Sequence, residues 1–472
     1  MSTHPFQELM NAVVDGGYCI GCGLCAAVER SPVRMRLDED GAYQPALVAD
    51  PAAGPTDTRV LEVCPFTGQG PDEDDLASSL FAPAPHRGDL GYHLTTYAGY
   101  AAEGDFRAQG SSGGMAKWLL AELLEQGLVD RVLQVRETEP DAAGPALFEY
   151  GVDDTVEGVH TGSRAAYHPV EMSQAIEFVR AHPGRYVITG VPCFIKGIRR
   201  LAVTDPVIAE RVRFTVGIIC GHLKTTGYAE SLAWQLGIPP QELAGIDFRT
   251  KLPGRTAREK GVTAYAADGR ASEPRVVQDL VGTKYPYGFF KYSACNFCDD
   301  VLAETADVAV GDAWLPEYVG SGNSVVVVRS EPIRVLLEDG RAAGRLHLEH
   351  IDPDRAAATQ AGGLRDRRQG LSYRLHLTRR AGRWHPPKRV TPSNELALPT
   401  RLLYRLRMEI PRRSIAAFRR ARVEQDLHGY LRRMRRWTRL YDLVVRLGRL
   451  RARTVAVLAR VGIGGRPGVR GR

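Results

Sequence analysis

The sequence has no run of about 18 apolar residues, so no segment is expected to cross a bilayer as a helix. Its opening stretch, MSTHPFQELM, lacks the basic region and the following apolar region that mark a secretory signal. Both absences predict a cytoplasmic protein whose thiols stay reduced. The eight cysteines are therefore expected to bind metal or to react, and disulfides are not expected.

Two common hydrolase signatures are also absent. The sequence contains no HExxH motif and no recognisable Ser/His/Asp arrangement, and it shows no internal repeat. The composition is that of a globular protein, with 44% apolar and 25% charged residues over 472 positions. Such a length predicts roughly two or three domains.

Charge is distributed unevenly along the chain. Lysine is absent from residues 401–472, which hold 21 arginines against four acidic residues, a net charge of +17. Because the whole chain carries +7, the remaining residues carry −10. The sequence therefore predicts a mildly acidic body and a strongly basic C-terminal extension.

Two linker-like stretches, APAPHRGD at 82–89 and HPPKRVTPSNELALPT at 385–400, divide the chain into three predicted segments: 1–85, 86–395 and 396–472. The first has few regular patterns and holds four cysteines. In the second, MAKWLLAELLEQG predicts a helix, while RYVITG, FTVGIIC, DVAVGD and SVVVVRS predict short buried strands. This alternation predicts an α/β body with a mixed sheet, followed by a basic helical extension.

The stretch CIGCGLCAAVER begins the first cysteine group. Cys19, Cys22 and Cys25 are spaced as in a ferredoxin, but Glu29 stands where a ferredoxin would have its next cysteine. Cys64 is followed by a proline, which is usual for a remote fourth ligand. We expect one [4Fe–4S] cluster on this N-terminal cysteine set (Cys19, Cys22, Cys25 and Cys64). Zinc is the alternative, although zinc usually takes cysteines in two separated pairs.

The other four cysteines form the central cysteine set (Cys193, Cys220, Cys295 and Cys298). Cys193 and Cys220 each follow a predicted strand, and the carboxyl ends of neighbouring strands can converge. A second [4Fe–4S] cluster is the leading interpretation. Zinc, catalytic thiols and small buried core residues remain alternatives.

The chain resembles the beta subunit family of coenzyme F420-reducing hydrogenases and dehydrogenases, which includes the plant 7-hydroxymethyl chlorophyll a reductase. The resemblance covers roughly residues 15–330 and rests on CIGCGLCAAV, QGSSGGMAKWLLAELLEQGLVD, VITGVPCFIKGIRRL, GIICGHLKTTGYAESLAWQLGI, DFRTK and ACNFCDDVLAETADVAVGDAWLP. It implies a flavoprotein body with a ferredoxin-like N-terminal iron–sulfur region. It also implies FAD, two [4Fe–4S] clusters and F420 as a possible co-substrate.

This resemblance implies an oxidoreductase that exchanges hydride at FAD and single electrons through the clusters, with a ferredoxin or a catalytic subunit as redox partner. Two alternatives stay open. The chain could be an electron-transfer subunit without its own substrate, or a zinc-stapled binding protein that keeps only the fold. No catalytic residue is predicted.

The flavin pyrophosphate needs backbone amides and hydroxyls, which the Gly-rich loop QGSSGG supplies at a helix start. Its residues are Gln109, Gly110, Ser111, Ser112, Gly113 and Gly114. Further candidates for FAD contacts are Ser163, Arg164, Thr189, Arg249, Lys251 and Asp312. The Gly-rich loop could instead be a helix cap without a ligand, and each of the other candidates an ordinary loop or strand-edge residue.

In the basic extension, Pro411 is expected to start a helix. Apolar residues then follow at heptad-like spacing: Val423, Leu427, Tyr430, Met434, Trp437, Tyr441 and Val444. This seam could pack on the body or on a second copy in a homo-oligomer. It could also lie on an anionic membrane surface, with its aromatic residues at the interface and the protein peripheral to the membrane. Nucleic-acid binding is less favoured because no base-reading module is present.

Overall fold

The computed structural model describes residues 4–48, 58–138, 146–252, 254–255, 259–318 and 322–460, with side chains up to residue 450. Its N-terminal region contains more regular structure than the sequence pattern indicates. The elements are α1 (Pro5–Leu9), the π-helical turn η1 (Met10–Val14), the antiparallel strands β1 (Val33–Leu37) and β2 (Tyr43–Leu47), α2 (Arg59–Val63) and α3 (Glu73–Phe81). These short elements pack against the body through a shared core.

Eight strands of the described residues form the main sheet, in the order β15-β5-β14-β13-β9-β8-β6-β7. They are β5 (Thr95–Ala101), β6 (Arg131–Glu137), β7 (Phe148–Asp153), β8 (Tyr186–Gly190), β9 (Val212–Ile218), β13 (Val308–Asp312), β14 (Ser324–Val328) and β15 (Leu346–His350). Strands β6, β8, β9 and β13 run parallel, and β7, β14 and β15 are antiparallel to their neighbours. The predicted α/β body with a mixed sheet is confirmed.

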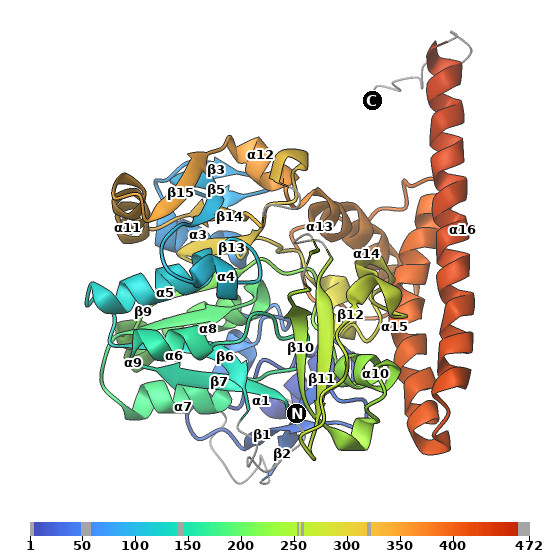
Figure 1. Cartoon of the computed structure of the whole chain (residues 1–472), viewed down its shortest axis with the longest axis horizontal. Helices are drawn as coiled ribbons and strands as arrows, with labels where there is room; N and C mark the ends of the chain where they lie inside the picture. Colours follow the sequence, from blue (N-terminus) through green and yellow to red (C-terminus); the bar gives the residue numbers. More distant parts are fainter. Residues whose placement is uncertain are drawn as a thin grey trace.

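Helices cover both faces of this sheet, as Figure 1 shows. One face packs against α7 (Ser173–Ala181), α8 (Pro192–Thr204) and α9 (Pro206–Arg211). The other packs against α5 (Met115–Glu125), α6 (Val156–Thr161) and α11 (Glu331–Ala342). Alternate strand residues supply the two cores: Ile188 and Val327 face the first, Val187 and Val326 the second.

A smaller sheet lies between the main sheet and the C-terminal helices (Figure 1). It consists of β10 (Leu243–Thr250), β11 (Gly261–Ala266) and β12 (Arg275–Val276), and it packs against α10 (Gly227–Gln235). The remaining elements are β3 (His86–Arg87), β4 (Gly91–Tyr92), α4 (Phe106–Gln109), η3 (Pro240–Glu242), η4 (Val277–Asp279), η5 (Tyr285–Tyr287), η6 (Ser293–Phe297), η7 (Pro316–Tyr318), α12 (Pro353–Ala358), α13 (Ala361–Arg365), η8 (Asp366–Gly370) and α14 (Leu371–Arg380).

The basic extension folds into two long helices, α15 (Leu398–Glu424) and α16 (Leu427–Arg460), which pack side by side as a C-terminal hairpin (Figure 1). The hairpin shares one hydrophobic core with α10 and the smaller sheet. Within the predicted seam, Tyr430, Met434 and Tyr441 are buried in this core. The seam therefore packs on the protein's own body.

Two details of the predicted extension are wrong. Pro411 does not start a helix, because α15 begins at Leu398 and runs through the proline. Val423 does not belong to the seam, since it lies on α15 and is 83% exposed. The predicted heptad spacing continues across the turn between α15 and α16. Gln425 in this turn has a φ of +51°, so residues before and after it do not lie on one helix face.

Candidate functional site

The N-terminal cysteine set lines one small cavity. Cys19, Cys22 and Cys25 lie in the loop between η1 and β1, and Cys64 directly follows α2. The rest of the lining is mostly apolar: Leu9, Val13, Val14, Tyr18, Ile20, Gly23, Met35, Pro45, Pro65 and Phe66. Four sulfur atoms in an apolar cavity form a donor set suited to an iron–sulfur cluster or to zinc.

Two glycines fix the shape of this cysteine loop. Gly21 and Gly23 have φ angles of +68° and +84°, a region that other residues rarely adopt. A Cβ on Gly21 would lie 2.7 Å from the carbonyl oxygen of Tyr43, and one on Gly23 would lie 2.1 Å from Oε2 of Glu171. The loop is therefore held tightly between β2 and the segment that precedes α7.

The four thiols of this set share an environment that disfavours isolated charge. Burial raises the pKa of every thiol in the set, that of Cys19 to about 12. The Cys64 thiol raises the pKa of Cys19 and Cys22 further, whereas Arg200 and Lys196 lower that of Cys64. Since metals bind the thiolate form, the set fits a positively charged centre that all four sulfurs share.

The central cysteine set lies at the carboxyl ends of two neighbouring parallel strands. Cys193 follows β8 at the start of α8, and Cys220 follows β9. Cys295 lies in η6, and Cys298 directly follows it. Burial raises the pKa of Cys193, and the other three thiols of the set raise it further. Four thiols from three separate segments therefore lie within electrostatic reach of one another.

Buried cations surround the central cysteine set. Burial raises the pKa of Cys220 and Cys298, and the Arg367 guanidinium opposes both increases. Arg367 also donates to the carbonyl oxygen of Gly221, next to Cys220. The buried Lys388 ammonium likewise opposes the increase at Cys298. This positive surrounding suits a ligand with net negative charge, such as a cluster held by four thiolates.

The two cysteine sets are neighbours. The Cys22 thiol contributes to the raised pKa of Cys193, although the two residues belong to different sets. Burial raises the pKa of Tyr150, and both Cys193 and Cys22 raise it further, so this tyrosine lies near both sets. A Cβ on Gly197 of α8 would lie 2.3 Å from Cδ1 of Leu24. The helix that begins near Cys193 therefore passes directly against the N-terminal cysteine loop.

Within the described residues, no group of three or more His, Cys, Asp or Glu side chains is arranged to hold a single metal ion. A [4Fe–4S] cluster makes a different demand, because its four thiolates bind four different irons.

The Gly-rich loop lies at the same edge of the main sheet as Cys193 and Cys220. It follows β5, which has the same direction as β13 because β14 is antiparallel to both. The carbonyl oxygen of Gly113 accepts a hydrogen bond of 2.8 Å from the N–H of Ala101. The N–H of Gly113 donates to Ser324 Oγ over 3.1 Å. Gly114 precedes α5 with a φ of +78°. The carboxyl edge of an α/β sheet is the usual place for a ligand site.

Basic side chains converge on this loop. Nη1 of Arg249 and Nζ of Lys260 both donate to the carbonyl oxygen of Ser111, over 3.0 and 2.5 Å, and Nζ of Lys251 donates to that of Ala108. Arg249 also donates to the Tyr167 hydroxyl over 3.1 Å. These cations supply the positive charge that a pyrophosphate requires beside the backbone amides of the loop.

Two lysines near this loop, the buried Lys117 and the half-buried Lys260, have lowered pKa values. Burial lowers the pKa of Lys117 to about 8, with a further contribution from Arg164. Burial likewise lowers the pKa of Lys260 to about 8, and Arg249 contributes to this decrease. An anionic ligand would relieve this repulsion and raise both pKa values.

The structure brings Arg249, Lys251 and Asp312 to the Gly-rich loop, whereas Ser163 and Thr189 form hydrogen bonds to the main sheet. Arg249 joins the Gly-rich loop to Asp312 through an ion pair of 3.5 Å. Thr189 instead uses its hydroxyl within the sheet, donating to the Leu133 carbonyl oxygen over 3.4 Å. The N–H of Ser163 donates a hydrogen bond of 2.8 Å to the carbonyl oxygen of Val135 in β6.

Sequence reasoning missed several residues of the site: Lys117, Tyr167, Lys260, Arg367 and Lys388. A signal existed for Lys117, because it is a lone cation among the apolar residues of MAKWLLAELL. No sequence signal pointed to Arg367 or Lys388. They lie in arginine-rich and proline-rich stretches and reach the central cysteine set only through the fold.

Two family models match the chain, and both describe the coenzyme F420 hydrogenase/dehydrogenase beta subunit. The model of its N-terminal part matches residues 96–177, and the model of its C-terminal part matches residues 184–354. These ranges include the Gly-rich loop and the central cysteine set. The N-terminal cysteine set and the C-terminal hairpin lie outside them.

Two relatives come from Methanocaldococcus jannaschii. The coenzyme F420-dependent sulfite reductase is 20% identical over 429 residues, which is 83% of this chain and 60% of that protein. An uncharacterized protein is 21% identical over 344 residues, 69% of this chain and 87% of its own length. A chain of the F420-reducing [NiFe] hydrogenase complex from Methanosarcina barkeri aligns with a TM-score of 0.47 and 17% identity, over 66% of this chain and 100% of that one.

Proposed function

The chain belongs to the coenzyme F420 hydrogenase/dehydrogenase beta subunit family, and we propose that it is an iron–sulfur flavoprotein linking a hydride carrier to a one-electron partner. Family membership gives it an oxidoreductase or electron-transfer role. The specific proposal adds FAD, two [4Fe–4S] clusters, and F420 or a similar deazaflavin or nicotinamide as the hydride carrier.

One observation carries this proposal: all eight cysteines gather in two adjacent sets of four, and the central set shares a sheet edge with a basic Gly-rich loop. When bound, FAD exchanges hydride with a two-electron carrier and single electrons with [4Fe–4S] clusters. Neighbouring sites for these groups on one protein suit conversion between the two kinds of electron transfer.

The protein's own residues provide binding, orientation and charge. The eight thiolates would hold the irons of the two clusters. The Gly-rich loop presents backbone amides, while Arg249, Lys251 and Lys260 neutralise phosphate charge beside it. Arg367 and Lys388 offset the negative charge of the central thiolates. The apolar lining of the N-terminal set keeps water from its sulfurs.

The partner is proposed to be a ferredoxin or a separate catalytic subunit. The F420-dependent sulfite reductase relative is longer, and this chain spans about 60% of its length. We therefore do not propose sulfite reduction as an activity of this chain. F420 is proposed as the hydride carrier because the family descriptions and that relative's name share it.

The first test is anaerobic purification with iron, sulfide and flavin quantification. About eight irons and one FAD per chain are expected. Cys64→Ser should leave about four irons, while Arg249→Gln combined with Lys260→Gln should lower FAD content and keep the iron. A colourless protein that contains zinc would refute the proposal. Oxidation of reduced F420 by the isolated chain with a dye acceptor would separate an enzyme from an electron-transfer subunit.

A further inference from the structure

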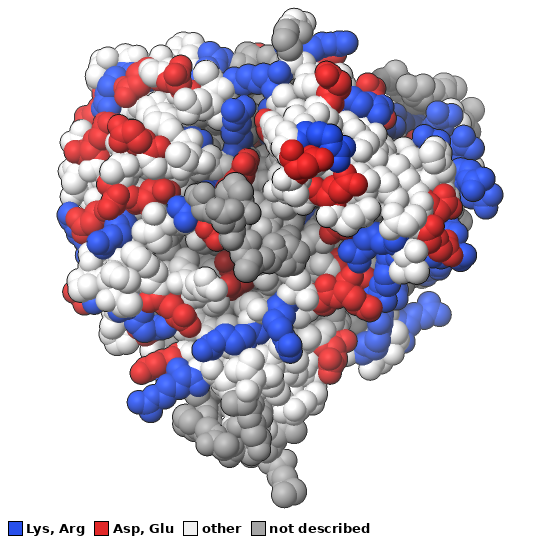
Figure 2. Space-filling view, turned by 60° about the horizontal axis from the view of Figure 1, so that its bottom comes forward, with Lys and Arg blue, Asp and Glu red and all other residues white. Residues whose placement is uncertain are grey.

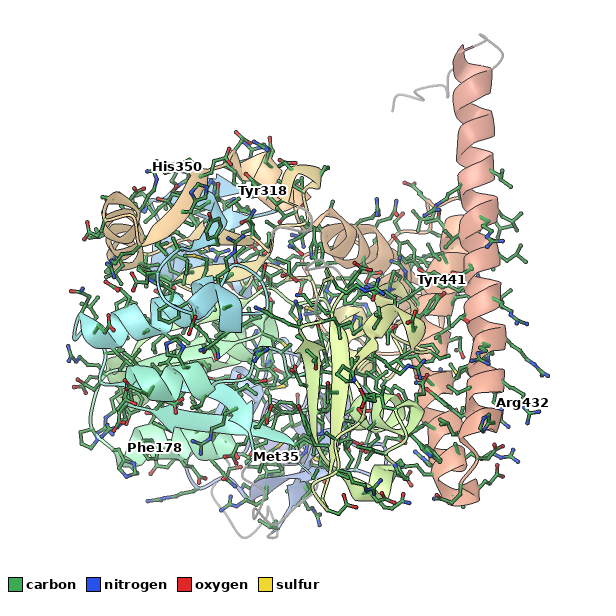
Figure 3. The ribbon with its side chains drawn as sticks, in the orientation of Figure 1. Met35, Phe178, Tyr318, His350, Arg432 and Tyr441 are labelled. Atoms are coloured by element: carbon green, nitrogen blue, oxygen red, sulfur yellow. The ribbon has the colours of Figure 1, made fainter. Side chains whose placement is uncertain are left out.

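The outer face of α16 carries a row of exposed leucines. Leu440, Leu443 and Leu447 are 43%, 53% and 51% exposed, and their spacing of three and four residues places them on one side of the helix. The residues of the buried seam, such as Met434 and Tyr441, lie on a different side. In Figure 3, Tyr441 points toward the body and Arg432 points away from it.

Two more leucines are exposed at the same end of the C-terminal hairpin. Leu398 and Leu402, at the start of α15, are 62% and 42% exposed. This end of α15 lies against α16, because a Cβ on Gly448 would be 3.7 Å from Cβ of Pro399. We call these five leucines (Leu398, Leu402, Leu440, Leu443 and Leu447) the leucine end of the hairpin.

Arginines border the leucine row of α16, and the described part of this helix turns no acid outward. The described side chains of α16 include seven arginines: Arg432, Arg433, Arg435, Arg436, Arg439, Arg446 and Arg449. The one acid of this stretch, Asp442, accepts the Tyr287 hydroxyl over 3.0 Å and lies 3.9 Å from Lys284, so it faces the body. Across the described residues, none of the seven arginines lies within ion-pair distance of a carboxylate.

Positive charge continues beyond these arginines. Residues 451–472 contain six more arginines, no acid, and the apolar stretch TVAVLA. Figure 2 shows many basic side chains along the right edge of the molecule, where the hairpin lies, with some acidic side chains beside them. No helix in the described part of the chain is long and apolar enough to span a membrane.

Three occupants of such a surface make different demands. Nucleic acid would use the arginines but would leave the leucines exposed to water. A second copy in a symmetric dimer would bring two arginine-bordered faces together, at a cost in repulsion. An anionic lipid surface uses both features, since leucines enter the boundary of the acyl chains while guanidinium groups bind phosphates.

We propose that the leucine end of the C-terminal hairpin docks the protein on an anionic lipid surface, with α16 lying in the plane of the interface. This differs from the expectation drawn from the seam, because Tyr430 and Tyr441 are buried in the body and cannot reach lipid. The inference does not depend on the cofactors.

The test uses the full-length holoprotein and vesicle flotation. Vesicles of phosphatidylcholine with phosphatidylglycerol should bind at least about tenfold more protein than phosphatidylcholine alone, and salt should weaken this binding. The variant Leu440→Gln, Leu443→Gln, Leu447→Gln should bind the anionic vesicles about tenfold more weakly. Val203→Gln, at a 68% exposed position on α8, is the matched control and should bind as the parent does.

Three outcomes would overturn the proposal. Equal binding to both vesicle types would remove the role of lipid charge. A triple variant that binds like the parent would remove the role of the leucines. A parent dimer that becomes monomeric in the triple variant would assign the leucine end to a second copy. Unchanged iron and flavin content in the variant checks that it remains folded.

Discussion

At the scale of single residues, the cysteine loop depends on two glycines as much as on its thiols. Gly21→Ala should cost roughly 1–3 kcal/mol, because its φ is +68° and the new Cβ would lie 2.7 Å from the Tyr43 carbonyl oxygen. Distortion of the loop should lower iron content from about eight to about four per chain. Gly88→Ala is the control, since a Cβ there meets no atom within 4 Å. Full iron content in Gly21→Ala would contradict this account.

Arg367 is expected to raise the reduction potential of a cluster on the central cysteine set. Its guanidinium is buried beside Cys220 and Cys298, and a fixed positive charge favours the reduced, more negative state of a cluster. Arg367→Gln should therefore lower that midpoint by tens of millivolts in a titration followed by electron paramagnetic resonance. Arg432→Gln, on the outer face of α16, should leave it unchanged. Equal midpoints in the parent and Arg367→Gln would rule out this role.

His168 should make stability depend on pH. Burial lowers its pKa from 6.5 to about 4, so between these values the unfolded chain binds more protons than the folded one. Stability should therefore decrease as the pH falls through this window, by roughly 2 kcal/mol between about pH 7 and pH 5. Urea unfolding of the parent and of His168→Gln at both pH values isolates this contribution. An equal loss of stability in the parent and in His168→Gln would assign the pH dependence to other groups.

At the scale of elements, Pro411 shows why the predicted helix start was wrong. Proline has no N–H, so it leaves the carbonyl oxygen of Arg407 without its helical partner. Here Nζ of Lys291 donates to that oxygen over 3.2 Å, and α15 continues through the proline. The sequence cannot reveal a donor that lies more than a hundred positions away, so it predicts a helix start where the fold supplies a replacement hydrogen bond.

The two sides of α16 should respond differently to truncation. Met434 is fully buried in the core shared with α10, so Met434→Ala should cost about 2–5 kcal/mol in unfolding free energy. Leu440→Ala, on the exposed row, should change it by less than about 0.5 kcal/mol. Chemical denaturation measures both values. A large loss at Leu440 would mean that this row packs within the protein.

Strands and helices of the body were predictable because their patterns are strong. Runs such as SVVVV form strands buried on both faces, and the apolar spacing of MAKWLLAELLE fits one helix. The N-terminal elements were not predictable, since α1, η1 and α2 each contain only five residues. Such short elements form because they pack against the body, and local propensity alone would not support them.

At the scale of the whole molecule, spacing and fold contribute different parts of the site. The C-x2-C-x2-C spacing groups Cys19, Cys22 and Cys25, and the Cys-Pro pair predicts Cys64 as the fourth member. The central set was predicted only from two strands whose carboxyl ends could converge, and the parallel pairing of β8 with β9 gives this convergence its geometry. Its cations, Arg367 and Lys388, come from the segment around α14, and no local pattern connects them to these cysteines.

The hydrogen bond between Lys291 and Arg407 has a mechanical consequence. A second one joins the N–H of Phe290 to Ser414 Oγ over 2.9 Å, so α15 holds the segment that leads directly to Cys295 at two points. A force that shifts α15 therefore also shifts the backbone of the central cysteine set. A mechanical load on the C-terminal hairpin is thus passed to the backbone that leads to Cys295.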